Sequence, residues 1–299
     1  MQVHFIGLGE VNMFNLAVAL HKKGEIVTGS DENFDASLTA IMQEQGLVSN
    51  KVGWFSDKIN DQLDVVVLGG NVKNDNPELV RAKELGLRLV SFPEFLFELS
   101  KYKTRVVVAG SENRTKIISM ILHVLEYNEV EADYVSMKPN GIRLTERNDF
   151  ILMEGDDGPS SVIDATPQFH IYQPNIALLG DITFGEGSFY NDFETYTEQY
   201  GTFVDSIVKG GSITYNVEDS EVKKRVESSE NPIRKFPYTT PEYQEEDGQI
   251  VLDTPDGEMP LEITEANDLR NMAGAKWVCQ QMGVDEVEFY EAMATYRQL

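Results

Sequence analysis

Short apolar runs alternate with helix-patterned segments over the first hundred residues, and this alternation strongly limits the folds open to the chain. The apolar runs predict strands at residues 3–6, 26–28, 64–68 and 87–90. Between them, Met13, Leu16 and Leu20 follow helical spacing, another helix is predicted at 36–45, and Asn76-Pro77 is typical of a helix start. Strands that alternate with helices form βαβ units, so we predict a parallel sheet.

A polar, basic segment at residues 99–104 separates this region from a second one of the same kind. The second region has a strand, a helix and two more strands predicted at 105–109, 115–125, 150–153 and 176–179. We therefore predict an α/β protein with two domains. Residues 1–103 form an N-terminal Rossmann-like parallel-sheet domain, and residues 104–299 form a P-loop-type α/β central domain.

The remainder of the chain predicts helices and hairpins around this second sheet. One amphipathic helix carries a stripe that we assign to the core: Phe193, Tyr196, Tyr200, Phe203, Val204 and Ile207. Residues 240–262 are acidic and rich in turns, which is typical of edge hairpins. Two helices, near 268–282 and 285–296, are expected to close the sequence.

The composition excludes several classes of function. A net charge of −25 repels phosphate backbones and anionic lipid, so we expect no nucleic-acid or membrane partner. The single cysteine, Cys279, allows no intrachain disulfide and is expected to be a buried thiol. We identify no secretory signal and no apolar run of membrane-spanning length, and therefore expect a cytoplasmic protein of undetermined oligomeric state.

The first glycine loop, residues 7–12 (GLGEVN), lies between a predicted strand and a predicted helix. Gly7 permits a tight turn, Gly9 lets the backbone approach a diphosphate, and the helix N-terminus supplies amide donors. Asp31, at the end of the next strand, could bind a sugar hydroxyl. Because Glu10 places a negative charge beside this anion site, a tight turn without a ligand stays open as the alternative.

The second glycine loop, residues 110–115 (GSENRT), has the strand-to-helix context of a phosphate-binding loop with altered residues. Asn113 stands where glycine is usual, and asparagine tolerates a positive φ. Arg114 replaces the usual lysine with a planar, bulkier cation. Thr115 retains a hydroxyl that could ligate magnesium, whereas Glu112 adds a negative charge. We favour an altered loop that joins strand to helix over a tight ATP site.

The chain resembles the Mur ligases, the ATP-dependent amide-forming enzymes of peptidoglycan synthesis. The nearest subgroups are the murein peptide ligases and the UDP-N-acetylmuramate–L-alanine ligases, and the resemblance covers essentially the whole chain. It rests on segments that occur in the family's order: VHFIGLGEVNMF, DNPELVRAKELGL, RVVVAGSENRTKIISMILHVL, the strand ending in Glu154, NPIRKFPY and NDLRNMAGAKWVCQQMGVDE.

The resemblance implies a role for each motif. The first domain is expected to bind a UDP-muramoyl substrate through Gly7, Leu8, Gly9, Asn12 and Met13 near the diphosphate and Ser30 and Asp31 near the nucleoside. The second domain is expected to bind ATP and Mg²⁺. Its implied nucleotide contacts are Gly110, Ser111, Asn113, Arg114, Thr115 and Asn271, with Thr115 and Glu154 as metal ligands and Arg114, Thr115 and Glu154 as the catalytic set.

Several family positions are altered. Gly185-Glu186 stands where the family has an aspartate-histidine pair, although Glu186 could still offer an oxygen ligand to magnesium. Asn267-Asp268 stands where the family has histidine-asparagine. The family's third domain, which closes over ATP and carries the incoming amine, is expected to begin about where this sequence ends.

In the family, ATP phosphorylates a substrate carboxylate and an amine then displaces the phosphate. Each lost electrostatic group would cost about 2–4 kcal/mol of transition-state stabilisation. We therefore expect a UDP-muramoyl-binding, Mur-ligase-like protein with weak or no ligation as this chain. A ligase fragment that needs its third domain is the alternative. A further alternative is a Rossmann NAD-binding protein. The second glycine loop argues against this alternative.

Overall fold

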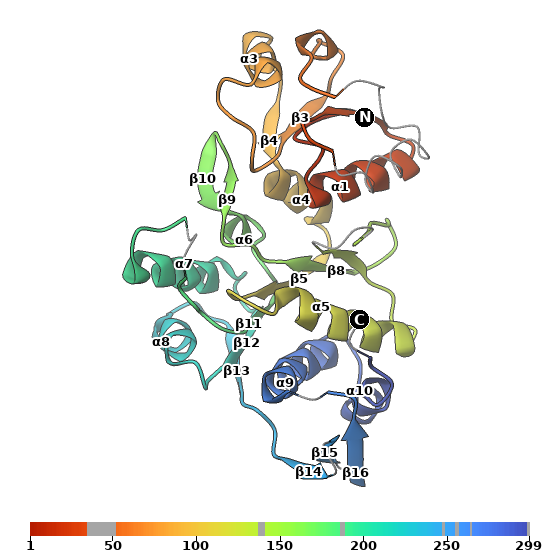
Figure 1. Cartoon of the computed structure of the whole chain (residues 1–299), viewed down its shortest axis with the longest axis vertical. Coiled ribbons are helices and arrows are strands. Elements are labelled where there is room, and N and C mark those ends of the chain that lie inside the picture. The colour runs from red at the N-terminus through yellow and green to blue at the C-terminus, as the bar shows by residue number, and fades with distance from the viewer. Residues whose placement is uncertain are drawn as a thin grey trace. The chain divides into compact units, whose positions relative to one another are not determined.

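The structure is a computed structural model that describes residues 1–34, 52–136, 141–185, 189–246, 249–254, 257–263 and 265–297 (Figure 1). The helix predicted at 36–45 and the altered position Glu186 lie outside these residues. The described chain divides into two compact units. Unit 1 comprises 1–101, 134–145 and 158–172, and unit 2 comprises 102–133, 146–157 and 173–299. The break at 101/102 lies within the polar segment chosen as the boundary, but two later segments also group with unit 1.

Unit 1 is built on a parallel four-stranded sheet in the order β2-β1-β3-β4, as the alternation predicted. Its strands and helices are β1 (Gln2–Ile6), α1 (Val11–Lys22), β2 (Ile26–Ser30), the 3-10 helix η1 (Ser56–Lys58), β3 (Val65–Leu68), α3 (Pro77–Glu84), β4 (Leu89–Ser91) and α4 (Phe92–Ser100). β1 and β3 are almost entirely buried, which explains their uninterrupted apolar sequences.

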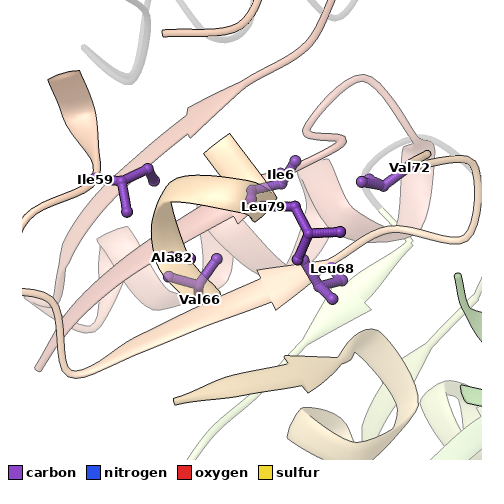
Figure 2. Packing of buried hydrophobic residues seen from close by; sticks show 7 residues of the cluster. All are labelled: Ile6, Ile59, Val66, Leu68, Val72, Leu79 and Ala82. Carbon is purple, nitrogen blue, oxygen red and sulfur yellow. The ribbon is translucent and has the colours of Figure 1, made fainter. Parts of the chain in front are cut away.

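Apolar side chains from β1, β3 and α3 pack on one face of this sheet (Figure 2). Val66 and Leu68 of β3 lie against Leu79 and Ala82 of α3, and Ile6 joins them from β1. Their burial removes apolar surface from water at roughly 25 cal/mol per Å², which fixes α3 on the sheet. The carboxyl ends of β1 and β3 are thereby held side by side.

Two helices of unit 1 begin at capping residues. Asn76 caps α3 by accepting the amides of Glu78 and Leu79, as the Asn76-Pro77 pair predicted. Ser91 and Glu94 form a capping box at the start of α4. We did not predict α4, although its capping signal is present in the sequence.

The segments that return to unit 1 later in the chain are short. They contain β7 (Ile142–Arg143), β9 (Pro159–Ser161), β10 (Asp164–Pro167) and α6 (Gln168–Ile171). β9 and β10 form an antiparallel pair, and β7 pairs antiparallel with β6 (Asp133–Val135). A single cut near residue 103 misses these segments because their grouping depends on contacts far apart in sequence.

Unit 2 contains five parallel strands in the order β13-β12-β11-β5-β8. Its main elements are β5 (Thr104–Ala109), α5 (Arg114–Tyr127), β8 (Phe150–Glu154), β11 (Ile176–Leu179), α7 (Phe193–Ser206), β12 (Ser212–Asn216), α8 (Ser220–Ser228), β13 (Arg234–Tyr238), α9 (Ala266–Gln281) and α10 (Glu286–Met293). α5 packs with α9 and α10, whereas α7 packs with α8 (Figure 1). These parallel sheets confirm the predicted α/β class.

The hairpins expected at 240–262 form a three-stranded antiparallel sheet of β14 (Tyr243–Glu246), β15 (Gln249–Thr254) and β16 (Gly257–Leu261). The stripe on α7 is buried as predicted except for Phe193, which is 43% exposed because it lies in the first turn of the helix. Cys279 is buried and free. In the described part of the chain, no helix combines the length and apolar character that a bilayer crossing requires.

Candidate functional site

The first glycine loop forms a turn between β1 and α1, which we call the first cradle (residues 7–10 with residues 69–71 after β3). Gly7 has φ +95°, a conformation that glycine adopts readily. At Gly9 a Cβ would lie 2.2 Å from the carbonyl oxygen of Asn33 and 2.9 Å from Oδ2 of Asp31. Both glycines are therefore required by the turn itself, whether or not a ligand binds.

The amides of this loop are bound within the chain. Gly7 N and Leu8 N donate to the carbonyl oxygen of Ser30 at 3.0 and 3.1 Å. Gly9 N donates to Oδ2 of Asp31 at 2.8 Å, and Glu10 N donates to Gly7 O at 3.3 Å. Asp31 thus lies beside the loop, at the end of β2, and there stabilises the turn.

The carboxylate of Glu10 faces the turn that follows β3. Its Oε1 accepts Asn71 N at 2.9 Å, and its Oε2 accepts Gly70 N at 3.2 Å. A Cβ on Gly69 would lie 2.5 Å from Oε1, so the carboxylate rests directly on that glycine. Burial raises the pKa of Glu10, opposed by the two amides and aided by the charge of Asp31. The protein's own carboxylate therefore supplies the anion here.

The other residues expected to contact the UDP-muramoyl substrate lie near the first cradle, but their side chains contact other parts of the protein. Leu8 and Met13 are buried in the core, and Oδ1 of Asn12 accepts the amide of Met13 at 2.9 Å. The hydroxyl of Ser30 accepts Nζ of Lys58 at 2.9 Å. The structure brings these residues to one end of the sheet, but their side chains bind within the protein.

A small cleft of about 220 Å³ lies beside the Glu10 turn in unit 1. It is lined by Glu32, Trp54, Asn71, Lys73, Asp75, Asn76 and Pro77. Trp54 offers an aromatic ring and Lys73 a cation, which are groups that suit a base and a phosphate. Trp54 is not among the binding residues expected from the sequence. Its place in this cleft depends on the fold of the β3–α3 connection.

The second glycine loop, residues 110–115 between β5 and α5, is the second cradle. Asn113 has φ 59° and ψ 2°, a left-handed conformation, and is the N-cap residue of α5. The prediction that asparagine would preserve the bend is confirmed. Gly110 has φ +139°, and a Cβ there would lie 3.2 Å from both the amide and the carbonyl oxygen of Asp181. This glycine is required by the close approach of Asp181.

Asp181 closes the second cradle from the end of β11. Its carbonyl oxygen accepts Ser111 N at 2.9 Å, and its Oδ1 accepts Glu112 N at 3.0 Å. Burial raises the pKa of Asp181, and the charge of Glu112 acts in the same direction. Sequence analysis missed this residue. Its position immediately after a buried strand that neighbours β5 was the available signal, because parallel strands end at the same edge.

Arg114 turns back on its own loop. Its Nη1 donates to the carbonyl oxygen of Gly110, and its Nη2 lies 3.4 Å from Oδ2 of Asp156. Its Nε lies 3.9 Å from Oε1 of Glu154, the same oxygen that accepts the hydroxyl of Thr115 at 2.7 Å. The predicted catalytic set is therefore assembled in one place. The guanidinium of Arg114, however, pairs with the carboxylates of Glu154 and Asp156.

A magnesium–triphosphate complex needs hard oxygen ligands for the metal and backbone amides that can bind the phosphates. Thr115 and Glu154 offer hard oxygen atoms, but the guanidinium of Arg114 already lies 3.9 Å from Oε1 of Glu154. Two loop amides that could wrap phosphates are paired with Asp181. Among the described residues, no group of three or more histidine, cysteine, aspartate or glutamate side chains is arranged to hold a metal. As placed, these residues do not fit a magnesium–triphosphate complex.

The proposed adenine contact lies on α9. Asn271 is buried, and its Nδ2 lies 3.5 Å from Oδ1 of Asp268, which also binds Nζ of Lys116 at 2.7 Å. Asp268 of the altered Asn267-Asp268 pair is therefore buried and forms a partly buried ion pair to α5. Gly185 is exposed, and its neighbour Glu186 is outside the described residues.

Tyrosines on and before α7 extend the second cradle. Oδ2 of Asp157 accepts the hydroxyl of Tyr200 at 3.0 Å, and Asp157 O accepts that of Tyr190 at 2.8 Å. The hydroxyls of Tyr196 and Tyr200 lie 2.9 Å apart. Burial raises the pKa of Tyr190 to about 12, with further contributions from Asp157 and other neighbours. The α7 stripe is thus core with a hydrogen-bonded polar edge.

Comparison with known proteins finds a family match over the first part of the chain. Residues 2–104 match the family described as "Mur ligase family, catalytic domain". A UDP-N-acetylmuramate–L-alanine ligase from Sulfurihydrogenibium is 25% identical over 99% of this chain and 65% of its own length. The chain spans 62% to 65% of the length of this ligase and of two further curated relatives of the same name.

Solved structures show the same fold. The UDP-N-acetylmuramate:L-alanyl-γ-D-glutamyl-meso-diaminopimelate ligase from Neisseria meningitides has a TM-score of 0.88, with 20% identity over 100% of this chain and 98% of that one. A MurF ligase from Thermotoga maritima, solved in complex with ADP, has a TM-score of 0.53, with 14% identity over 79% of this chain and 58% of that one.

Proposed function

Because the chain carries a Mur ligase family domain, we propose that it is a Mur-ligase-like protein of peptidoglycan synthesis or recycling that binds a UDP-muramoyl nucleotide. We propose residues 1–103 as the UDP-sugar domain and residues 104–299 as the ATP-type domain. In this proposal the chain alone has weak or no ATP-dependent amide ligation.

Binding in the first domain is supported by several features at one end of its sheet. Gly7 and Gly9 hold the backbone in a tight turn at the start of α1. Asp31 lies next to Gly9. The cleft beside Asn71 supplies Trp54 and Lys73, an aromatic surface and a cation for a nucleotide. We assign the diphosphate to the first cradle and the nucleoside to the groups around it.

The weak or absent ligation rests on one observation: the second cradle binds its own carboxylate and its own cation. The carboxylate of Asp181 accepts the amide of Glu112, and its backbone carbonyl oxygen accepts that of Ser111. Arg114 contacts the Gly110 carbonyl and Asp156 instead of extending toward a ligand. Phosphoryl transfer depends on such amides and cations being available to the phosphates. In this chain both are committed to internal partners.

Calorimetric titrations with UDP-N-acetylmuramate and with magnesium-ATP, together with thermal melts in the presence of each of these ligands or of NADH, test this function. We expect UDP-N-acetylmuramate to bind and to raise the Tm more than magnesium-ATP does, at about pH 6. A larger shift with magnesium-ATP would contradict the proposal and favour an active ligase. A shift with NADH but with neither of these ligands would favour a dinucleotide-binding protein instead.

One observation favours a ligase fragment as the second candidate. The hydroxyl of Thr115 and Oε1 of Glu154 lie 2.7 Å apart, and Asn113 preserves the bend of the loop. In this candidate Arg114 leaves Glu154 and Asp156 when ATP binds, and the two oxygens then ligate magnesium. The test is ADP release from magnesium-ATP with UDP-N-acetylmuramate and L-alanine, with the family's third domain supplied as a separate polypeptide. Release above that of the added domain alone would establish this candidate.

A further inference from the structure

The groups that accept the backbone amides of the first cradle differ in how easily a ligand could displace them. The amides of Gly7 and Leu8 are bound by the carbonyl oxygen of Ser30, which belongs to β2 and cannot move without the sheet. The amide of Gly9 is bound by Asp31, whose other oxygen also holds Asn33 N. Glu10 differs because it reaches the Gly70 and Asn71 amides through a side chain with three rotatable bonds.

Glu10 also occupies the space that a phosphate would use. Its carboxylate accepts two consecutive backbone amides, which is the way that turns bind anions. It rests on Gly69, and its Oε1 would lie 3.4 Å from a Cβ on Gly7. It is therefore enclosed between the turns that follow β1 and β3. A diphosphate at these glycines would approach both the carboxylate and its two donors.

We propose that Glu10 determines the ligand specificity of the first cradle by acting as a built-in anion that a diphosphate must displace. This inference rests on the proposed function, because it concerns the same UDP-sugar site. A bound diphosphate would take over the Gly70 and Asn71 amides while Glu10 rotates out or accepts a proton. The cradle therefore selects against anionic ligands that cannot compete with an attached carboxylate.

Displacement of Glu10 couples ligand binding to pH. The charged group that faces Glu10 from β2 is Asp31, and the Gly70 and Asn71 amides face it from the turn after β3. Burial and Asp31 oppose ionisation of Glu10, so its carboxylate takes up a proton more readily than an exposed one. A protonated Glu10 neither repels phosphate nor holds the amides as strongly. Diphosphate affinity should therefore rise as pH falls.

The test measures the Kd of UDP-N-acetylmuramate by calorimetry across about pH 5.5 to 8. The diphosphate of this ligand is esterified at both ends and stays fully ionised in that range. Glu10→Ala frees both amides, and Glu10→Gln removes the charge while keeping one acceptor. Glu84→Ala is the matched control, because it removes an exposed carboxylate of the same unit that pairs with Arg81 on the surface of α3.

We expect wild type and Glu84→Ala to bind more tightly as pH falls. Glu10→Ala should bind about tenfold more tightly than wild type near neutral pH, with a weaker pH dependence, and Glu10→Gln should shift in the same direction. Equal affinities and equal pH slopes in all four proteins would overturn the role of Glu10 while leaving nucleotide binding intact. Failure of every folded variant to bind at any pH would overturn the proposed function, and this inference with it.

Discussion

Oδ1 of Asp181 accepts the backbone amide of Glu112 at 3.0 Å, so the second cradle of this chain holds a carboxylate of its own. The first cradle does the same, since Glu10 accepts the amides of Gly70 and Asn71. In both cases the acidic group comes from, or reaches to, the end of a neighbouring parallel strand. Both turns therefore keep the architecture of an anion site while an internal anion satisfies their donors.

Asp181→Ala should increase ATP binding. The substitution releases the Glu112 amide and removes a negative charge from the cradle, while the Asp181 carbonyl still holds Ser111. We expect affinity for magnesium-ATP to rise about three- to tenfold, as judged by calorimetry. Glu198→Ala, which removes an exposed carboxylate from α7 in the same unit, should leave affinity unchanged. Equal weak binding by both variants would mean that Asp181 does not limit access to the loop.

Asn113→Gly combined with Arg114→Lys should also increase ATP affinity. Glycine keeps the left-handed conformation at 113, and lysine lacks the planar group that bridges Gly110 and Asp156.

Asn113→Ala tests the backbone alone: alanine at φ 59° should lower the free energy of unfolding by about 1 kcal/mol. Asn191→Ala, at an exposed position without positive φ, is the control. Similar unfolding curves for both alanine variants would contradict the assigned strain at 113.

The features that the sequence could predict are those set by interactions between residues close together in the chain. Asn76 and Pro77 predicted the start of α3 because the cap involves amides two and three residues away. Asn113 indicated a left-handed conformation because asparagine itself tolerates a positive φ. The capping box of Ser91 and Glu94 is equally local, although the helix that it begins was not predicted. Local chemistry was sufficient for these elements.

The acceptors in the two cradles could not be assigned in the same way. Glu112 and Asp181 are 69 residues apart, and Glu10 and Asn71 are 61 residues apart. Alternating strands and helices indicated that the strand ends would meet, but not which side chain would reach which amide. The negative charge of Glu10 was recognised as unfavourable for a bound anion, yet only the structure identifies its partners on the turn after β3.

Glu78→Ala should strongly destabilise unit 1. Glu78 is fully buried and binds Nε2 of His4 at 3.1 Å and the amide of Phe55 at 2.7 Å. Its removal leaves buried polar groups without partners, and we expect a loss of about 3 kcal/mol in the free energy of unfolding by urea denaturation. Glu84→Ala on the same helix removes only a half-exposed pair to Arg81 and should cost less than about 0.5 kcal/mol. Comparable losses in both variants would argue against a structural role for the buried pair.

The two internal carboxylates should also give the stability of the protein a particular pH dependence. Burial is the largest cause that raises the pKa of Glu10 and that of Asp181 above their ordinary values. Between the ordinary and the raised pKa, the folded state binds more protons than the unfolded state. The contribution of each group to the free energy of unfolding therefore falls as pH increases through that interval.

Urea denaturation of wild type and of Glu10→Gln combined with Asp181→Asn, at several values from about pH 4 to pH 7.5, isolates this contribution. Other carboxylates titrate in both proteins, so the difference between the two curves is the informative quantity. The double variant should gain stability relative to wild type as pH rises, because it lacks two groups that ionise against burial. A difference that is flat, or that changes in the opposite direction, would mean that the Gly70, Asn71 and Glu112 amides offset the burial of these carboxylates completely.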